Sequence, residues 1–237
     1  DENSSLLMDY GYDNERVFMQ CISGDKIKKK VYAGNCEYIE EDGVTKILTY
    51  LDGPMGVFAV CVKTEGNDTS ETINYIHKDN LTSWNIITDE DGRLLEKLSF
   101  DAWGNIRDPQ KWEEDFKGES TLFDRGFTSH EHLCDFGLIN MNGRFYNPRI
   151  SRMLSPDNNI QMLQSSQNFN RYSYCLNNPL KYKDPTGECV ESLVFGIVGG
   201  AANVLFNADA IDSFGEFGLL FGIGFVKAPG IKRVILK

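Results

Sequence analysis

The feature that most constrains this fold is a series of short segments with alternating apolar and polar residues, separated by turn residues, from position 1 to about 106. Period-two alternation puts the apolar side chains on one face of an extended segment, as in a half-buried strand. Turn signals recur between the segments, among them Ser23-Gly24-Asp25, Glu41-Asp42-Gly43 and Asp89-Glu90-Asp91-Gly92-Arg93. This spacing predicts successive hairpins that add to one another in an antiparallel sheet.

The charge of the chain argues against a nucleic-acid partner. Its formal net charge is -11 over 237 residues, whereas binding to phosphates requires clustered Lys and Arg. Only residues 26–30 and 227–237 are locally basic, and runs this short are expected to be solvated faces. With 41% hydrophobic residues, the chain can nevertheless bury a core.

No metal or cofactor is expected. The six cysteines form no CxxC pair, and their spacing leaves free thiols and an occasional disulfide as open alternatives. His130 and His132 flank Glu131 at a spacing that suits one face of a strand, but no third ligand stands nearby. Because most zinc sites need three or four ligands, we expect these histidines to pack in the interior.

A second pattern, between residues 124 and 188, is specific enough to suggest a family. It comprises Gly-Leu-Ile-Asn-Met-Asn-Gly-Arg-Phe-Tyr-Asn-Pro (137–148), Arg-Tyr-Ser-Tyr (171–174), Asn-Asn-Pro (177–179) and Asp-Pro-Thr-Gly (184–187). Together these elements resemble the RHS repeat-associated core. This core is the conserved end of the RHS and YD-repeat shells of polymorphic toxins, of the C component of insecticidal toxin complexes and, more distantly, of teneurins. Phe-Thr-Ser-His-Glu (127–131) is similar to a further element of that core, with Ser129 in place of Gly.

The resemblance extends to the first part of the chain. Tyr12-Asp13, the segment 75–81 and Phe100-Asp101-Ala102-Trp103-Gly104-Asn105 are similar to the YD repeat, in which a carboxylate beside each turn caps backbone donors. An ordinary meander of hairpins would use the same residues, and for the first seventy residues that alternative stays open.

The resemblance implies a mainly β fold with four parts. Residues 1–106 would form curling antiparallel hairpin repeats of the shell, 107–120 a linker, 121–188 a core or plug domain, and 189–237 a hydrophobic, Gly-rich, helical tail like a pre-toxin segment. The chain would be the C-terminal piece of something longer.

Three residues carry the chemistry that the resemblance implies. Cleaving members of the family have an Arg in a Gly-Arg-aromatic-Tyr element, an Asp in a Leu-Ser-x-Asp element and a second Asp in an Asp-Pro-x-Gly element. Here these are Arg144, Asp157 and Asp184. Two neighbouring carboxylates that share a proton can act as acid and base in an aspartyl-type self-cleavage. By resemblance, the bond cut is Glu188–Cys189.

The sequence departs from the cleaving pattern at three places, one of which is a longer spacing between the two aspartates, where residues 161–169 resemble an inserted polar loop. Asp157 is followed by Asn158-Asn159 and not by Pro-x-Gly, and Glu188 stands where cleaving members usually have Leu. The alternative is that Arg144 and the two aspartates form turns and a structural salt bridge. In neither case do we expect an enzyme that turns over external substrates.

The implied function is encapsulation and delivery of a C-terminal toxin by a secreted or cell-surface effector in competition between bacteria. The partners would be the chain's own tail or toxin as cargo, secretion machinery and immunity proteins, and the tail could also contact a membrane. Two alternatives stay open. One is a surface module that binds carbohydrate or protein through aromatic platforms such as Trp84, Trp103 and Trp112; the other is a remnant that has lost its toxin.

Overall fold

The computed structural model describes residues 4–12, 15–53, 56–65, 69–112, 121–133, 136–158, 166–188 and 191–192. In these residues the chain is mainly antiparallel β, as the sequence predicts, and its remaining regular elements are short 3-10 turns. Apart from residues 191–192, the predicted helical tail lies outside the described residues.

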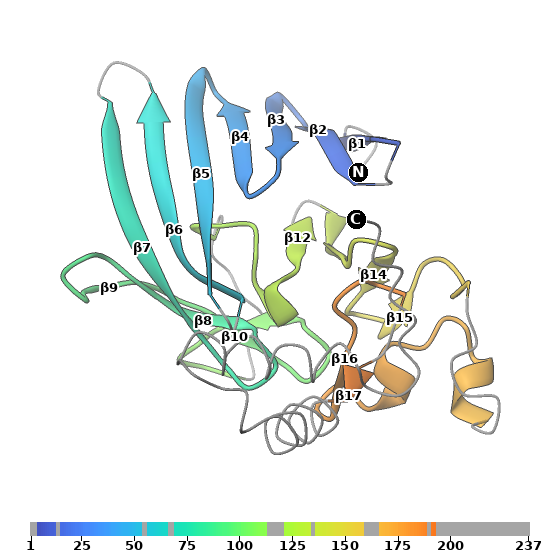
Figure 1. The fold of residues 1–237 in the computed structure, drawn as a ribbon. Coiled ribbons are helices and arrows are strands. Elements are labelled where there is room, and N and C mark those ends of the chain that lie inside the picture. The colour runs from blue at the N-terminus through green and yellow to red at the C-terminus, as the bar shows by residue number, and fades with distance from the viewer. Residues whose placement is uncertain are drawn as a thin grey trace, which may run out of the picture.

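Nine strands of the described part form one sheet in which every strand pairs with its neighbours in the sequence. They are β1 (Ser4–Tyr10), β2 (Arg16–Ser23), β3 (Lys26–Ala33), β4 (Cys36–Glu41), β5 (Val44–Gly53), β6 (Gly56–Glu65), β7 (Ser70–Lys78), β8 (Trp84–Thr88) and β9 (Leu94–Lys97). The predicted addition of each hairpin to the next is therefore confirmed. In Figure 1 the strands lie side by side in a sheet that curves around the rest of the molecule.

Two-residue turns join the middle strands because glycine can adopt the positive φ that such turns require. β4 and β5 are connected by Asp42 and Gly43, with φ values of 50° and 76°. Two positive φ angles in a row are those of a type I′ turn, whose twist matches that of the flanking strands. Asp also tolerates this conformation better than most residues, so local chemistry sets the register of this hairpin.

A longer turn occurs three times, and each copy is capped by an aspartate. In each, one carboxylate oxygen accepts hydrogen bonds from the backbone N–H groups two and four residues later, at 2.7–3.0 Å: Asp79 from Leu81 and Ser83, Asp89 from Asp91 and Arg93, and Asp101 from Trp103 and Asn105. The fourth residue is left-handed in all three, as Thr82, Gly92 and Gly104. The expected carboxylate cap beside the turn is thus present at these positions.

The second half of the described chain is built from much shorter strands. A hairpin of β10 (Ser99–Phe100) and β11 (Ile106–Arg107) precedes a four-stranded sheet of β12 (Glu131–Leu133), β13 (Leu138–Asn140), β14 (Phe145–Asn147) and β15 (Arg152–Met153). The 3-10 turns are η1 (Phe127–Ser129), η3 (Ser166–Phe169) and η4 (Cys175–Asn177), and a last pair joins β16 (Tyr182–Lys183) to β17 (Glu191–Ser192). Figure 1 shows β12 on the concave side of the large sheet.

Two hydrophobic clusters hold these parts together. The first lies on the inner face of the large sheet, where Trp84 is fully buried and contacts the rings of Tyr50 and Phe123. The second, around Tyr146 and Tyr174, forms the interior of the smaller sheet. Since Phe123 precedes β12 and packs into the first cluster, apolar burial joins the smaller part to the sheet.

The burial of Trp84 bears on the aromatic platforms suggested for a binding module. Trp84 is completely covered, and Trp103 packs against the second cluster. Of the three tryptophans, Trp112 is 68% exposed, with Arg107 stacked over its ring. Trp84 therefore cannot serve as a contact platform.

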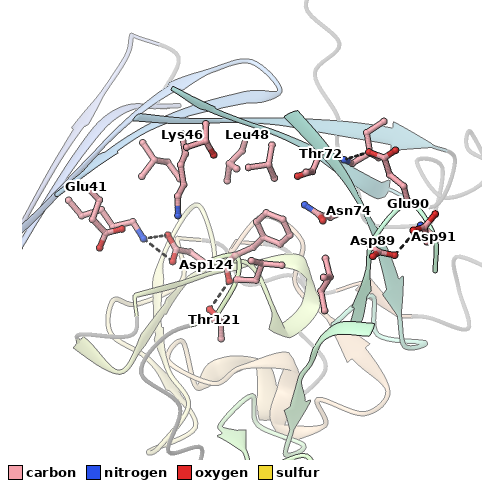
Figure 2. Close-up of a pocket in the computed structure, with 18 residues that line it drawn as sticks. Glu41, Lys46, Leu48, Thr72, Asn74, Asp89, Glu90, Asp91, Thr121 and Asp124 are labelled. Atoms are coloured by element: carbon pink, nitrogen blue, oxygen red, sulfur yellow. Dashed lines mark hydrogen bonds and ion pairs between the residues drawn. The ribbon is translucent and has the colours of Figure 1, made fainter. Parts of the chain in front are cut away.

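A cavity of about 850 Å³ lies between the concave face of the sheet and the segment that begins at Thr121. Figure 2 shows Lys46 and Leu48 reaching into it from the sheet and Asp124 from the opposite wall, with Asp89 to Asp91 at its far end. The inner face of the sheet is thus hollow where the smaller part does not fill it.

Candidate self-cleavage site

The three residues predicted to carry the chemistry meet in space although they span 40 positions of the sequence, from Arg144 to Asp184. Arg144 lies just before β14 and is 6% exposed. Its Nη2 atom is 3.0 Å from Oδ2 of Asp157 and 3.1 Å from Oδ2 of Asp184. Because one nitrogen makes both contacts, the two carboxylate oxygens can be no farther apart than the sum of these distances. The structure therefore brings together the residues that the sequence singled out.

The same guanidinium also contacts the backbone that leads to the expected cut. Its Nε donates a hydrogen bond to the carbonyl of Gly187, and its Nη1 donates to the carbonyl of Arg171 at 3.4 Å. A guanidinium has five N–H donors in a fixed plane, so it can orient two carboxylates and a peptide carbonyl together. A lysine could not reproduce this arrangement.

Two hydrogen bonds with Arg171 hold Asp157 in the site, although the Pro-x-Gly turn of the family pattern is absent here. The backbone N–H of Asp157 donates to the carbonyl of Arg171 at 2.8 Å, and Nε of Arg171 donates back to the carbonyl of Asp157 at 2.6 Å. The Asn158-Asn159 departure therefore does not remove Asp157 from the site.

The segment before the expected cut is held by a close approach that only glycine permits. The N–H of Gly143 donates to the carbonyl of Thr186 at 2.8 Å. Gly187 has a φ of 73°, and a Cβ atom there would lie 2.2 Å from the backbone oxygen of Met141. A side chain at position 187 would thus be both strained and blocked by backbone, which explains the glycine of the Asp-Pro-x-Gly element.

The Glu188–Cys189 bond falls within the loop between two paired strands. Tyr182 of β16 pairs with Ser192 of β17, and Lys183 pairs with Glu191. Cys189 itself lies outside the described residues. The chain on both sides of the expected cut is therefore anchored by backbone pairing.

Among the three residues of this site that the structure describes in contact, carboxylates outnumber cations. The side chain of Asp184 is 1% exposed and that of Asp157 is 13% exposed, and Arg144 contacts both. If both carboxylates were ionised, the three residues would carry a net charge of -1, and burying such an excess is costly. A single shared proton would make the group neutral, as in pairs of aspartates that work as acid and base.

His130 and His132 are engaged in hydrogen bonds that occupy the lone pairs a metal would need. Nδ1 of His130 is 2.8 Å from the hydroxyl of Thr128, and Nε2 of His132 accepts the backbone N–H of Phe127 at 2.9 Å. Burial lowers the pKa of both histidines to about 4, so both are neutral near pH 7. These contacts agree with the packing role expected for them.

A buried charged cluster, here called the Lys30 cluster, was missed by the sequence reasoning. Lys30 is 1% exposed and contacts Glu131 at 2.5 Å, Asp124 at 2.6 Å and Glu37 at 3.5 Å. The cluster further includes Arg16, which contacts Glu131, Lys28, which contacts Asp124, and Arg125, which contacts Glu37. Charged side chains of the sheet thus pair with oppositely charged side chains of the smaller part across the boundary between the two.

The interpretation of residues 26–30 as a solvated face was wrong for two of its lysines. In strand β3, Lys28 and Lys30 point inward to the carboxylates, while Lys29 points outward and its side chain is 44% exposed. Strand alternation predicts that lysines two apart share a face, and this was the signal that could have identified them.

Opposite charges in the Lys30 cluster favour the ionised forms of Lys30 and Glu131. Burial opposes the charge of Glu131, but the positive charges of Lys30 and Arg16 outweigh it and lower the pKa of Glu131 to about 2. Burial likewise opposes the charge of Lys30, yet the surrounding carboxylates raise its pKa well above the ordinary value. Lys30 and Glu131 are therefore both charged at neutral pH.

Two features are absent from the described part of the chain. None of its helices is long and apolar enough to cross a bilayer. None of its His, Cys, Asp and Glu side chains form a group of three or more able to hold a metal ion.

The chain is similar to small parts of much larger known proteins, and no family model matches it. Over 104 residues it is 32% identical to the tRNA3(Ser)-specific nuclease WapA of Bacillus spizizenii and 31% identical to the tRNA nuclease WapA of Bacillus subtilis strain 168. Each match covers 44% of this chain and 4% of the relative. The chain therefore spans only a small fraction of the length of these curated relatives.

Two solved structures are similar to this chain in fold. The crystal structure of TcdB2-TccC3 matches with a TM-score of 0.63 at 17% identity, and that of TcdB2-TccC3-Cdc42 with a TM-score of 0.61 at 17% identity. Both matches cover 77% of this chain and 9% of the other chain. At this identity the likeness concerns the fold alone, and together with the sequence relatives it supports an RHS-like fold for this chain.

Proposed function

We propose that this chain is the closing part of an RHS shell that encapsulates a C-terminal toxin and delivers it in competition between bacteria. Residues 1–106 would be the last YD repeats of the wall, and residues 121–188 the core that seals it. The curved sheet with a hollow inner face, the smaller part on its concave side and the likeness to TcdB2-TccC3 and WapA support this proposal. The cargo would be the tail or a toxin that follows it.

The remaining partners and the location follow from that proposal. An effector of this kind would be secreted or displayed on the cell surface, would use secretion machinery and would be matched by an immunity protein in the producing cell. Contact of the tail with a membrane belongs to the same proposal.

The shell would release its cargo by one self-cleavage at the Glu188–Cys189 bond. The observation that carries this part is the Arg144 guanidinium, which contacts Asp157, Asp184 and the Gly187 carbonyl together. These contacts gather two carboxylates beside the chain that leads to the bond.

In the proposed reaction one carboxylate is protonated and the other is ionised. Asp157, the more exposed of the two, takes a proton from water while the water oxygen adds to the carbonyl carbon of Glu188. Asp184 supplies its proton to the carbonyl oxygen of Glu188. When the tetrahedral intermediate collapses, the C–N bond breaks, Asp157 passes its proton to the departing nitrogen and Asp184 takes back a proton from a hydroxyl of the intermediate. The products are a carboxyl group on Glu188 and an amino group on Cys189.

The mass of the purified 237-residue chain tests this directly. We expect the wild-type chain to yield two polypeptides that meet at residues 188 and 189, and the Asp157→Asn and Asp184→Asn chains to stay intact. Each substitution keeps the size of the side chain but removes its acid–base capacity. Thermal unfolding of each variant shows whether it is folded.

Asp89→Asn is the matched control. Asp89 caps a turn of the sheet far from Arg144, and an asparagine oxygen can accept the same backbone hydrogen bonds. This variant should be cleaved like the wild type. An intact wild-type chain, or cleavage of a folded Asp184→Asn chain, would contradict the proposed self-cleavage and leave Arg144 with a structural role.

A further inference from the structure

Two side chains outside the Arg144 group point at a single backbone carbonyl in the segment that precedes the expected cut. Nε2 of His130 and Nδ2 of Asn142 are each 3.3 Å from the carbonyl oxygen of Pro185. His130 comes from the end of η1, and Asn142 comes from the turn between β13 and β14. A carbonyl oxygen has two lone pairs, so it can accept both donors together.

His130 is fixed as a donor by its own surroundings. A carbonyl oxygen cannot donate, so Nε2 carries the proton and Nδ1 accepts from the Thr128 hydroxyl at 2.8 Å. Thr128 is in turn tied to the large sheet, because its backbone N–H donates to the hydroxyl of Ser83 at 3.1 Å. His130 is 5% exposed, so its imidazole has little freedom to rotate away. A continuous set of hydrogen bonds thus runs from the sheet to Pro185.

The Pro185 contact completes a grip on three consecutive carbonyls. The next one, of Thr186, accepts the N–H of Gly143, and the one after that, of Gly187, accepts Nε of Arg144. Holding three carbonyls in a row defines the path of the backbone up to Glu188. Asp184 comes directly before these three residues. Holding their carbonyls therefore fixes the position of the Asp184 carboxylate relative to the Glu188–Cys189 bond.

We propose that His130 and Asn142 are positioning residues, which grip the Pro185 carbonyl and so hold the 184–188 segment in the geometry that self-cleavage requires. This inference rests on the self-cleavage proposed above. Neither side chain donates or accepts a proton in the reaction. Their effect is through placement, where an error of about 1 Å can slow a reaction roughly a hundredfold.

Three variants of the 237-residue chain separate this role from simple packing. His130→Leu removes the donor, and its cleavage should be at least about tenfold slower. His130→Gln places an amide N–H near the position of Nε2, and its cleavage should return to within roughly threefold of the wild-type rate. Asn142→Asp removes the donor and adds a negative charge beside Arg16, from which its oxygen can still accept, and an aspartate tolerates the φ of 69°. It should slow cleavage a few-fold without a change in melting temperature.

Hydrogen exchange gives a second readout that does not depend on cleavage. In the Asp157→Asn chain, which we expect to stay intact, the amides of residues 186–188 should exchange faster when His130 is leucine and at the original rate when it is glutamine. Faster amide exchange in the leucine variant and the original rate in the glutamine variant would support the proposed hold of His130 on the Pro185 carbonyl.

The outcomes distinguish the two proposals. If the wild-type chain is not cut, the proposed self-cleavage fails, and exchange alone decides whether His130 holds the segment. If the wild type is cut and folded His130→Leu is cut at the same rate, the positioning role is overturned while the self-cleavage stands. Equal loss of cleavage in the leucine and glutamine variants would also overturn it, because that result marks packing and not the Pro185 hydrogen bond.

Discussion

Lys30 and Arg144 are both buried cations surrounded by carboxylates, yet the two clusters are built differently. The Lys30 cluster joins β3 to residues of the smaller part, so it spans the boundary between the two parts of the molecule. The Arg144 group lies within the smaller part, and its guanidinium also contacts backbone carbonyls.

The Lys30 cluster and the Arg144 group differ most clearly in their net charge. In the described residues, four cations of the Lys30 cluster face three carboxylates, whereas a single cation faces two carboxylates around Arg144. An excess of positive charge in the Lys30 cluster favours the ionised form of its carboxylates. An excess of buried carboxylate favours a shared proton, which is what acid–base chemistry needs. The sign of the excess charge, and not burial of an ion pair as such, therefore separates the two clusters as candidates for acid–base chemistry.

Removing the central charge of the Lys30 cluster should have the largest effect on stability. Lys30→Met leaves Glu131 and Asp124 buried without their main partner, and we expect it to lower the free energy of unfolding by about 3–5 kcal/mol. Chemical denaturation measures this loss. Lys29→Met, on the exposed face of the same strand, should change the value by less than about 0.5 kcal/mol. Equal effects of the two substitutions would show that the buried cluster contributes nothing special.

Arg144→Lys should separate chemistry from stability. It keeps the charge but loses the planar set of donors, so we expect cleavage to stop while the free energy of unfolding falls by about 1–3 kcal/mol. Intact mass and chemical denaturation on one preparation give both values. A lysine variant that still cleaves would place the reaction outside the Arg144 group.

Mild acid should weaken the molecule through its histidines before it affects the Lys30 cluster. The pKa values of His130 and His132 are about 4 in the folded chain against an ordinary 6.5, so between those values the unfolded state binds more protons. Stability should therefore fall as the pH drops below about 6.5, by on the order of 1–2 kcal/mol per histidine between pH 7 and pH 5.

Glu131 has the same sign as the histidines but acts at a lower pH. Its pKa is about 2 in the folded chain, so its contribution is present above the ordinary carboxylate range and is lost only as the pH falls towards 2. The cost of Lys30→Met should hence be the same at pH 5 as at pH 7. His132→Gln should reduce the loss between pH 7 and pH 5, and unfolding curves that do not change with pH would contradict this account.

The smallest effect should come from a turn whose residues belong to neither charged group. Thr82 has a φ of 69°, where the two equivalent turns carry Gly92 and Gly104. Thr82→Gly relieves the strain of a β-branched residue in this conformation, and part of the gain is lost to the greater freedom of glycine in the unfolded chain. We expect a gain of about 0.5 kcal/mol in the free energy of unfolding and no change in cleavage rate. A loss of stability would show that the Thr82 side chain has a packing role of its own.

Much of the large sheet could be predicted because its determinants are local. Gly24 and the Asp42-Gly43 pair set tight turns, and the aspartates at 79, 89 and 101 cap the longer ones through atoms only two and four residues away. Each strand then pairs with its neighbour in the sequence, so no long-range choice had to be inferred.

The smaller part was predictable only through its motifs. Its strands have two or three residues, too few for any alternation to be read. The motif residues Arg144, Asp157 and Asp184 were nevertheless found by their resemblance to a family, and the structure places them in contact. Whether they cleave the chain stays a prediction.

The sequence by itself determined the antiparallel meander, its turns and the identity of Arg144 and of the two aspartates that its guanidinium contacts. Only the tertiary structure decided which lysines are buried, which tautomer His130 adopts and which groups hold Pro185. The reason is physical: turns and strand pairing depend on neighbours along the chain, whereas the burial and partners of a charge depend on segments about a hundred residues away, such as Glu131 opposite Lys30.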